Sequence, residues 1–118
     1  MTTRKQWIEA TRLGEYSVPS LQTDGFIHAS TISQVLPVAA KFYKGLSGLI
    51  LLEIDPKRLN SEVKWEPPTG GPPPGVPEGD AFPHIYGPVN LDAVTQVVDF
   101  DPDENGEFHL PASLNPGG

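Results

Sequence analysis

Apolar side chains recur at helical spacing near the start of the chain, which predicts a first helix over residues 3–13. Thr3 can cap its start and Gly14 can end it. We expect the apolar face of this helix to consist of Trp7, Ile8, Ala10 and Leu13.

A second helical pattern begins at Ser30 or Thr31, where Thr31 and Gln34 fit a capping box. Gly45 is placed to stop this helix. Because Pro37 lies within the pattern, we expect either an irregular first turn or a later start. The apolar positions of the pattern are Val35, Val38, Ala39, Phe42 and Leu46.

Four apolar or alternating runs predict strands. They are 26–27, ending in His28; 49–54, which is almost wholly apolar and therefore central; 63–66, which alternates; and 93–100, which closes the sheet. Strands mixed with two or three helices, without a regular βαβ repeat, predict an α+β fold around a small mixed or antiparallel sheet.

The chain of 118 residues is long enough for one domain, 1–118. Seven prolines fall within residues 67–83, so we expect 67–81 to form an exposed proline- and glycine-rich loop. A turn is expected at 104–106, and the tail over 103–118 is expected to be loosely ordered.

The net charge of −7 and the scattered basic residues argue against a nucleic-acid partner, which normally needs clustered Lys and Arg. No apolar run approaches the roughly 20 residues of a membrane helix, so no membrane partner is expected. The absence of cysteine excludes disulfides and thiol chemistry. Without a secretory signal pattern, we expect a cytoplasmic protein.

Five acids gather near the C-terminal end without a neighbouring Lys or Arg: Asp99, Asp101, Asp103, Glu104 and Glu107. They lack the glutamate that a calcium loop places at its twelfth position, so a folded acidic patch is the simpler interpretation. His109, in the tail, is expected to face solvent. Nothing in the spacing of the histidines enforces a metal site, and we predict none.

The segment from Asp24 to Thr31 ends an apolar strand in His28, and the hydroxyls of Ser30 and Thr31 follow at a helix start. Histidine changes charge near neutral pH, and helix amides favour negative charge. These residues can therefore bind a ribose hydroxyl or an anion. Alternatively, the hydroxyls only cap the helix and His28 binds a carbonyl.

A second histidine lies in Phe82-Pro83-His84-Ile85-Tyr86. On a strand, His84 and Tyr86 share one face. Either they line a pocket, or they hold the long loop against the sheet. Glu66 ends a strand before that loop and is a candidate general base or ribose ligand. We expect His28 and His84 to meet around one hollow, with Glu66 close by.

The candidate residues therefore divide into two sets. The candidate catalytic residues are His28, His84 and Glu66, and the candidate ligand-binding residues are Phe26, Ser30, Thr31 and Tyr86. Neither a Gly-x-Ser-x-Gly elbow nor a phosphate-binding Gly-x-x-x-x-Gly-Lys motif is present.

The ordered motifs resemble a family of proteins of unknown function, domain of unknown function family 952. They are Gly25-Phe26-Ile27-His28-x-Ser30, Phe42-Tyr43-x-Gly45, Leu49 to Asp55, Trp65-Glu66 and Phe82 to Pro88, within a match from about Trp7 to Phe100. The resemblance implies an ADP-ribosyltransferase-like fold, shared with NAD-dependent RNA 2′-phosphotransferases and poly-ADP-ribose polymerases. It further implies a cleft for NAD, ADP-ribose or a similar ligand, with His28 and Ser30 on its wall.

The chain departs from that family in two places. Members usually have a short Tyr-containing strand before the first helix, whereas Met1-Thr2-Thr3 leads almost directly into it here. If that strand is absent, one wall of the cleft is missing or comes from another copy, which would make the protein a homo-oligomer. The proline-rich insertion lies between Glu66 and His84, and no arginine cluster supports RNA phosphotransfer.

Three functions remain open from the sequence. The first is a cleft that binds an NAD- or ADP-ribose-like small molecule, with or without transferase activity. The second is an enzyme of small-molecule metabolism that uses His28, His84 and Glu66 for proton transfer. The third is a non-catalytic interaction module that binds through the proline-rich loop or the acidic tail.

Overall fold

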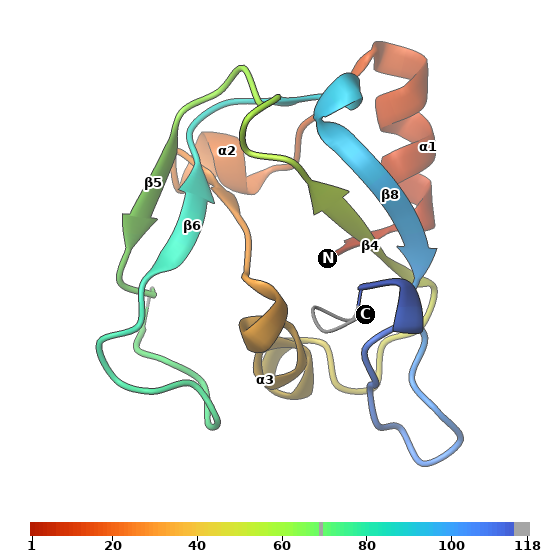
Figure 1. Ribbon diagram of the computed structural model, residues 1–118. Coiled ribbons are helices and arrows are strands. Elements are labelled where there is room, and N and C mark those ends of the chain that lie inside the picture. Colours follow the sequence, from red (N-terminus) through yellow and green to blue (C-terminus); the bar gives the residue numbers. More distant parts are fainter. Residues whose placement is uncertain (69, 115–118) are drawn as a thin grey trace.

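The computed structural model describes residues 1–68 and 70–114, which form an α+β fold of three small antiparallel sheets and three α-helices (Figure 1). The elements are β1 (Thr2–Thr3), α1 (Arg4–Leu13), β2 (Glu15–Tyr16), α2 (Ser20–Thr23), β3 (Ile27–His28), α3 (Ile32–Phe42), β4 (Leu49–Ile54), β5 (Val63–Glu66), β6 (Phe82–Ile85), β7 (Val89–Asn90) and β8 (Val94–Asp99). Short 3₁₀ turns cover Leu91–Ala93 and Ala112–Leu114. Within the described residues, no helix is long and apolar enough to cross a bilayer.

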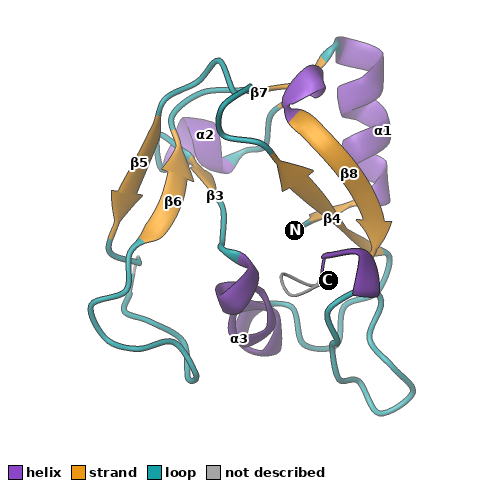
Figure 2. Cartoon of the chain, in the orientation of Figure 1, coloured by secondary structure: helices purple, strands orange, loops and turns teal. Residues whose placement is uncertain are grey.

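The sheets have the strand orders β1-β4-β8, β2-β7 and β3-β6-β5 (Figure 2). We expected one sheet, and its division is the main departure from the predicted fold. Two separate buried clusters explain it. One is built on Ile27, Ile85 and Val89, and the other on Leu49, Leu51 and Phe100. The β3-β6-β5 sheet packs on the first cluster, whereas the β1-β4-β8 sheet contributes to both, because Leu52, Ile54 and Val94 pack against the first.

The first helix has the predicted ends. The Thr3 hydroxyl accepts a hydrogen bond from the Gln6 amide at 3.1 Å, and Gly14 ends the helix with a left-handed φ of 89°. The predicted apolar face is only partly right. Ala10 is buried in the first core and Trp7 is packed against it, but Ile8 and Leu13 are 66% and 61% exposed. Only one side of this helix is therefore packed against the first core.

The N-terminal strand is present, although it is short. Thr2 and Thr3 form β1 and pair with Ile50 and Leu49 of β4. The sequence suggested that this strand, which would form one wall of the expected cleft, is absent. The structure contains it. The chain supplies its own first strand, which makes β4 the central strand of its sheet, as predicted.

The third helix begins after Thr31, whose amide donates to Gln34 Oε1 at 3.0 Å, as a capping box requires. Pro37 lies inside the helix, so neither a late start nor an irregular first turn was needed. The carbonyl that loses its partner belongs to Ser33, an exposed residue that water reaches. The helix ends at Phe42, before Leu46.

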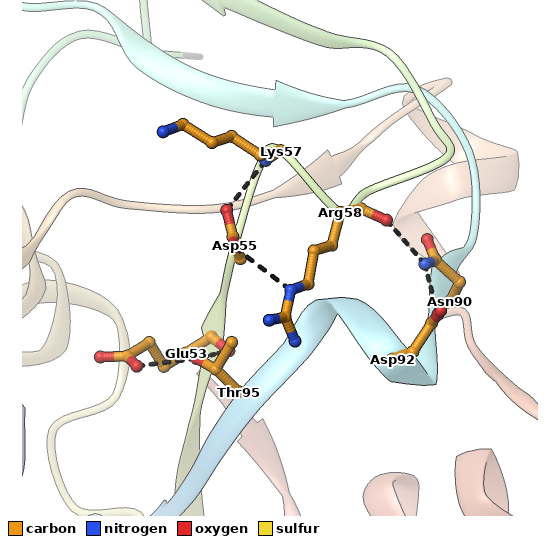
Figure 3. Close-up of polar contacts among 7 residues, drawn as sticks. All are labelled: Glu53, Asp55, Lys57, Arg58, Asn90, Asp92 and Thr95. Carbon is orange, nitrogen blue, oxygen red and sulfur yellow. Dashed lines mark hydrogen bonds and ion pairs between the residues drawn. The ribbon is translucent and has the colours of Figure 1, made fainter.

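The connection after β4 is held by polar contacts to the segment that precedes β8 (Figure 3). Asp55 accepts a hydrogen bond from the Lys57 amide at 2.9 Å and pairs with Arg58. The Asn90 side chain donates to the Arg58 carbonyl at 2.9 Å and accepts from the Asn60 amide at 2.9 Å. These bonds tie β7 to the chain that leads into β5.

The proline-rich segment between β5 and β6 is not exposed throughout. Pro73 and Val76 are buried, and a side chain at Gly75 would meet the Pro37 ring at 3.4 Å. Pro37 is thus a surface on which this segment packs.

The tail also packs more closely than expected. Phe108 stacks on Phe100 with ring centroids 4.9 Å apart, and Leu114 is buried in the second core. The tail up to Leu114 therefore belongs to the folded core, and residues 115–118 lie outside the described part.

Candidate functional site

Strand pairing brings the two predicted histidines together. In the antiparallel pair of β3 and β6, His28 lies directly opposite His84, and Lys64 of β5 lies opposite His84 on the other side. Residues directly opposite each other project from the same face of a sheet. The His28 and His84 rings are 5.6 Å apart, edge to face.

His84 is held in one orientation by Glu66. Its Nδ1 is 2.9 Å from Glu66 Oε1, and the ring is only 3% exposed. A carboxylate only accepts hydrogen bonds, so Nδ1 carries the hydrogen. In the neutral imidazole, Nε2 is then the acceptor.

Glu66 also accepts a hydrogen bond from the Tyr86 hydroxyl at 2.5 Å. The two donors, Tyr86 first and His84 second, lower the pKa of Glu66. The same bond raises the pKa of Tyr86, because ionising the phenol would remove the hydrogen from a carboxylate contact. Glu66 is therefore a fixed anion that holds two neighbouring side chains.

Phe26 closes the other face of the His84 ring. The two rings are stacked with centroids 4.0 Å apart and planes 14° apart. Phe26 also meets the His28 ring edge to face at 4.8 Å. The site is thus an aromatic cluster of Phe26, His28, His84 and Tyr86.

His28 has a carboxylate partner of its own. Its Nε2 is 2.9 Å from Asp24 Oδ2, one turn earlier, where α2 ends. Asp24 is a site residue that sequence reasoning missed, because a separation of four residues brings side chains together on a helix and gives no signal across the turn at Gly25 that leads into β3. Unlike His84, the His28 side chain is 47% exposed.

A cavity of about 660 Å³ lies beside this cluster and is lined by both His28 and His84. Its other walls come from Val38 of α3, from Tyr43 directly after that helix, and from Pro73 of the proline-rich segment. The volume lies within the range of about 300–1,000 Å³ typical of small-molecule sites.

The other candidate residues take different places around this cavity. Ser30 lines it, and Thr31 lines an adjoining cavity of about 410 Å³ that His28 and Ser30 also reach. Three candidate residues do not line the larger cavity: Phe26, Glu66 and Tyr86. Phe26 and Glu66 contact the His84 ring, which does line it, and Tyr86 donates a hydrogen bond to Glu66. Tyr16 and Tyr43 line that cavity and were not singled out, because aromatic residues at element ends look like core.

A separate group of three potential metal ligands lies in the tail. Asp103, Glu107 and His109 each place one ligand atom within 4.8 Å of the others, and all three are exposed. Asp103 Oδ2 is 2.8 Å from His109 Nε2, while Asp103 Oδ1 accepts from the Asn105 and Glu107 amides. Hydrogen bonds within this turn therefore explain why the three side chains lie close together.

Comparison with known proteins places this fold in a family. The profile of a family described as "Protein of unknown function (DUF952)" matches residues 1–97. The chain belongs to the DUF952 family. That membership confirms the resemblance drawn from its motifs. No curated protein matches the chain.

Solved structures similar to this DUF952 protein come from Caulobacter crescentus. The crystal structure of protein CC0527 is 32% identical, with a TM-score of 0.78, over 96% of this chain and 93% of that one. A double-mutant form of CC0527 gives the same values. The solution NMR structure of CC0527 is 33% identical, with a TM-score of 0.71, over 89% of this chain and 84% of that one.

Proposed function

We propose that this DUF952 protein binds a nucleotide-like small molecule, of the NAD or ADP-ribose class, in the cavity lined by His28 and His84. The observation that carries the proposal is the direct pairing of these histidines across β3 and β6, with both rings on the wall of a cavity of about 660 Å³. The similarity of the motif order to ADP-ribosyltransferase-like proteins, in which NAD lies in such a cleft, supports the same class of ligand.

In this proposal the two histidines are the polar contacts to the ligand. Glu66 holds the Nδ1 hydrogen of His84, so Nε2 is the atom offered to a ligand. Asp24 holds Nε2 of His28, so Nδ1 is offered there. Ser30 adds a hydroxyl on the same wall. Glu66 and Tyr86 are then positioning residues, because they act through His84.

The Glu66–His84 pair favours a second candidate, an enzyme that moves a proton on a small metabolite. A histidine oriented by a carboxylate is the arrangement of a general base, and such groups contribute about 10²–10⁴-fold in rate. A turnover that Glu66→Gln slows without weakening substrate binding would support this candidate. The third function, an interaction module, loses support from the burial of Pro73 and Val76.

Isothermal titration calorimetry with NAD, ADP-ribose and nicotinamide tests the proposed binding. We expect saturable heat with at least one ligand, weakened at least tenfold in His28→Ala. The matched control is His109→Ala, which changes a histidine far from the cavity lining. Absence of heat with all three at millimolar concentration, or equal weakening by both substitutions, would overturn the proposal.

A further inference from the structure

The cavity beside the two histidines offers hydrogen bonds but few charges. Among the described residues that line it, none is Lys, Arg, Asp or Glu. Besides the histidines, its polar side chains are Gln6, Tyr16, Ser20, Ser30 and Tyr43. All five are uncharged in their ordinary protonation states, so the wall is a set of neutral donors and acceptors between apolar surfaces.

Two of these groups are tyrosines, Tyr16 and Tyr43. Burial raises the pKa of both above the ordinary value for a phenol, so both remain hydrogen-bond donors over the physiological range.

Two lysines lie against aromatic rings, and neither lysine lines the cavity. Lys64 Nζ lies 4.7 Å from the centre of the Tyr86 ring, and Lys41 Nζ lies 5.4 Å from the centre of the Phe42 ring. Beside the histidines lie two carboxylates, Asp24 and Glu66. A phosphate placed next to the imidazoles would thus meet two carboxylates against one nearby ammonium, that of Lys64, within a protein of net charge −7.

The start of α3 already uses part of its hydrogen-bonding capacity. The Gln34 side chain already binds the Thr31 amide at 3.0 Å, and the Gln34 amide binds the Thr31 carbonyl at 3.0 Å. A helix N-terminus alone stabilises an exposed anion only modestly.

We propose that the cavity selects an uncharged, planar, hydrogen-bonding ring, such as a nucleobase, a nucleoside or nicotinamide, and discriminates against phosphorylated or carboxylated forms of the same ring. This inference rests on the proposed function and narrows it. The ring occupies the cavity beside His28 and His84, and any phosphate of a larger ligand is left outside the neutral wall.

Two matched ligand pairs test the selection by calorimetry on the full chain. Nicotinamide and nicotinate differ in an amide against a carboxylate, and adenosine and AMP differ in one phosphate. In each pair that binds, we expect the uncharged member to bind at least tenfold more tightly at low salt. Equal or tighter binding of the charged member would overturn the selection while leaving the proposed function intact. No binding by any of the four would overturn the selection, and the proposed function would fall with it only if NAD and ADP-ribose also gave no heat.

A change in the wall tests the cause of the selection. Ser20 is part of the lining, so Ser20→Lys adds a cation there, and Ser20→Gln is the uncharged control of similar length. We expect Ser20→Lys to reduce the adenosine-to-AMP preference at least fivefold and Ser20→Gln to leave it within twofold. A similar reduction by both variants, or none by Ser20→Lys, would show that charge does not set the selection.

Discussion

Replacing His84 by alanine should destabilise the fold far more than replacing His28, although the two residues are direct partners across the sheet. The His84 ring is 3% exposed and stacks on Phe26, whereas the His28 side chain is 47% exposed. Removing a buried side chain of about the size of leucine costs about 2–5 kcal/mol, and an aromatic stack adds about 0.5–1.5 kcal/mol. Partial collapse of the site reduces the sum, so we expect about 2–4 kcal/mol for His84→Ala.

For His28→Ala we expect a loss within about 0.5 kcal/mol, as for other exposed substitutions. Urea unfolding followed by far-UV circular dichroism measures both. With a slope of about 2 kcal/mol per molar urea, the middle of the usual range, His84→Ala should lower the midpoint by about 1–2 M. A midpoint no lower than that of His28→Ala would refute the packing assigned to the His84 ring.

Two further predictions concern the carboxylate beside His84 and the second core. The pKa of Glu66 is lowered in the folded state, so its contribution to stability is present above the unfolded pKa of about 4.3 and is lost as the pH falls through the folded value. Glu66→Gln should therefore be less stable than the wild type at pH 7, and the difference should vanish on acidification; a difference that persists at pH 2 would contradict the assignment. Phe100 is 1% exposed and stacks on Phe108, so Phe100→Ala should cost about 3–5 kcal/mol in urea unfolding, against about 0.5 kcal/mol or less for Val97→Ala on the exposed side of β8. Similar midpoints for those two variants would contradict the burial of Phe100 in the second core.

The elements that the sequence predicted well are those with a local cause. The first helix has a capping threonine and a terminal glycine, and the central strand Leu49–Ile54 is apolar at every position except Glu53. Each signal is contained within the element itself. The same holds for the capping box of α3, in which Gln34 lies three residues from Thr31.

The departures arise where distant segments decide the outcome. Pro37 was expected to disturb α3, but its ring supports the loop at Gly75, a contact that no local pattern encodes. Ile8 and Leu13 are exposed because no second layer covers them. Phe108 packs because Phe100 lies beside it, so a polar tail contains a residue of the core.

The candidate site divides in the same way. The sequence singled out His28 and His84 because each lies among apolar neighbours. Their position opposite each other in β3 and β6 comes from pairing between segments more than fifty residues apart, which no local pattern encodes. The role of Glu66 as the hydrogen-bond partner of His84 follows from that pairing through β5. Tyr16 and Tyr43 join the cavity only through the tertiary fold.

Imidazole ¹⁵N resonances followed during titration with nicotinamide or adenosine test most directly whether the two histidines share a ligand cavity. The chain has three histidines, and His109 is bonded to Asp103 in the tail, outside the lining. We predict that His28 and His84 shift together, with one saturation curve, while His109 stays unchanged. If the first two remain still, or all three move alike, the shared cavity is not where the ligand binds.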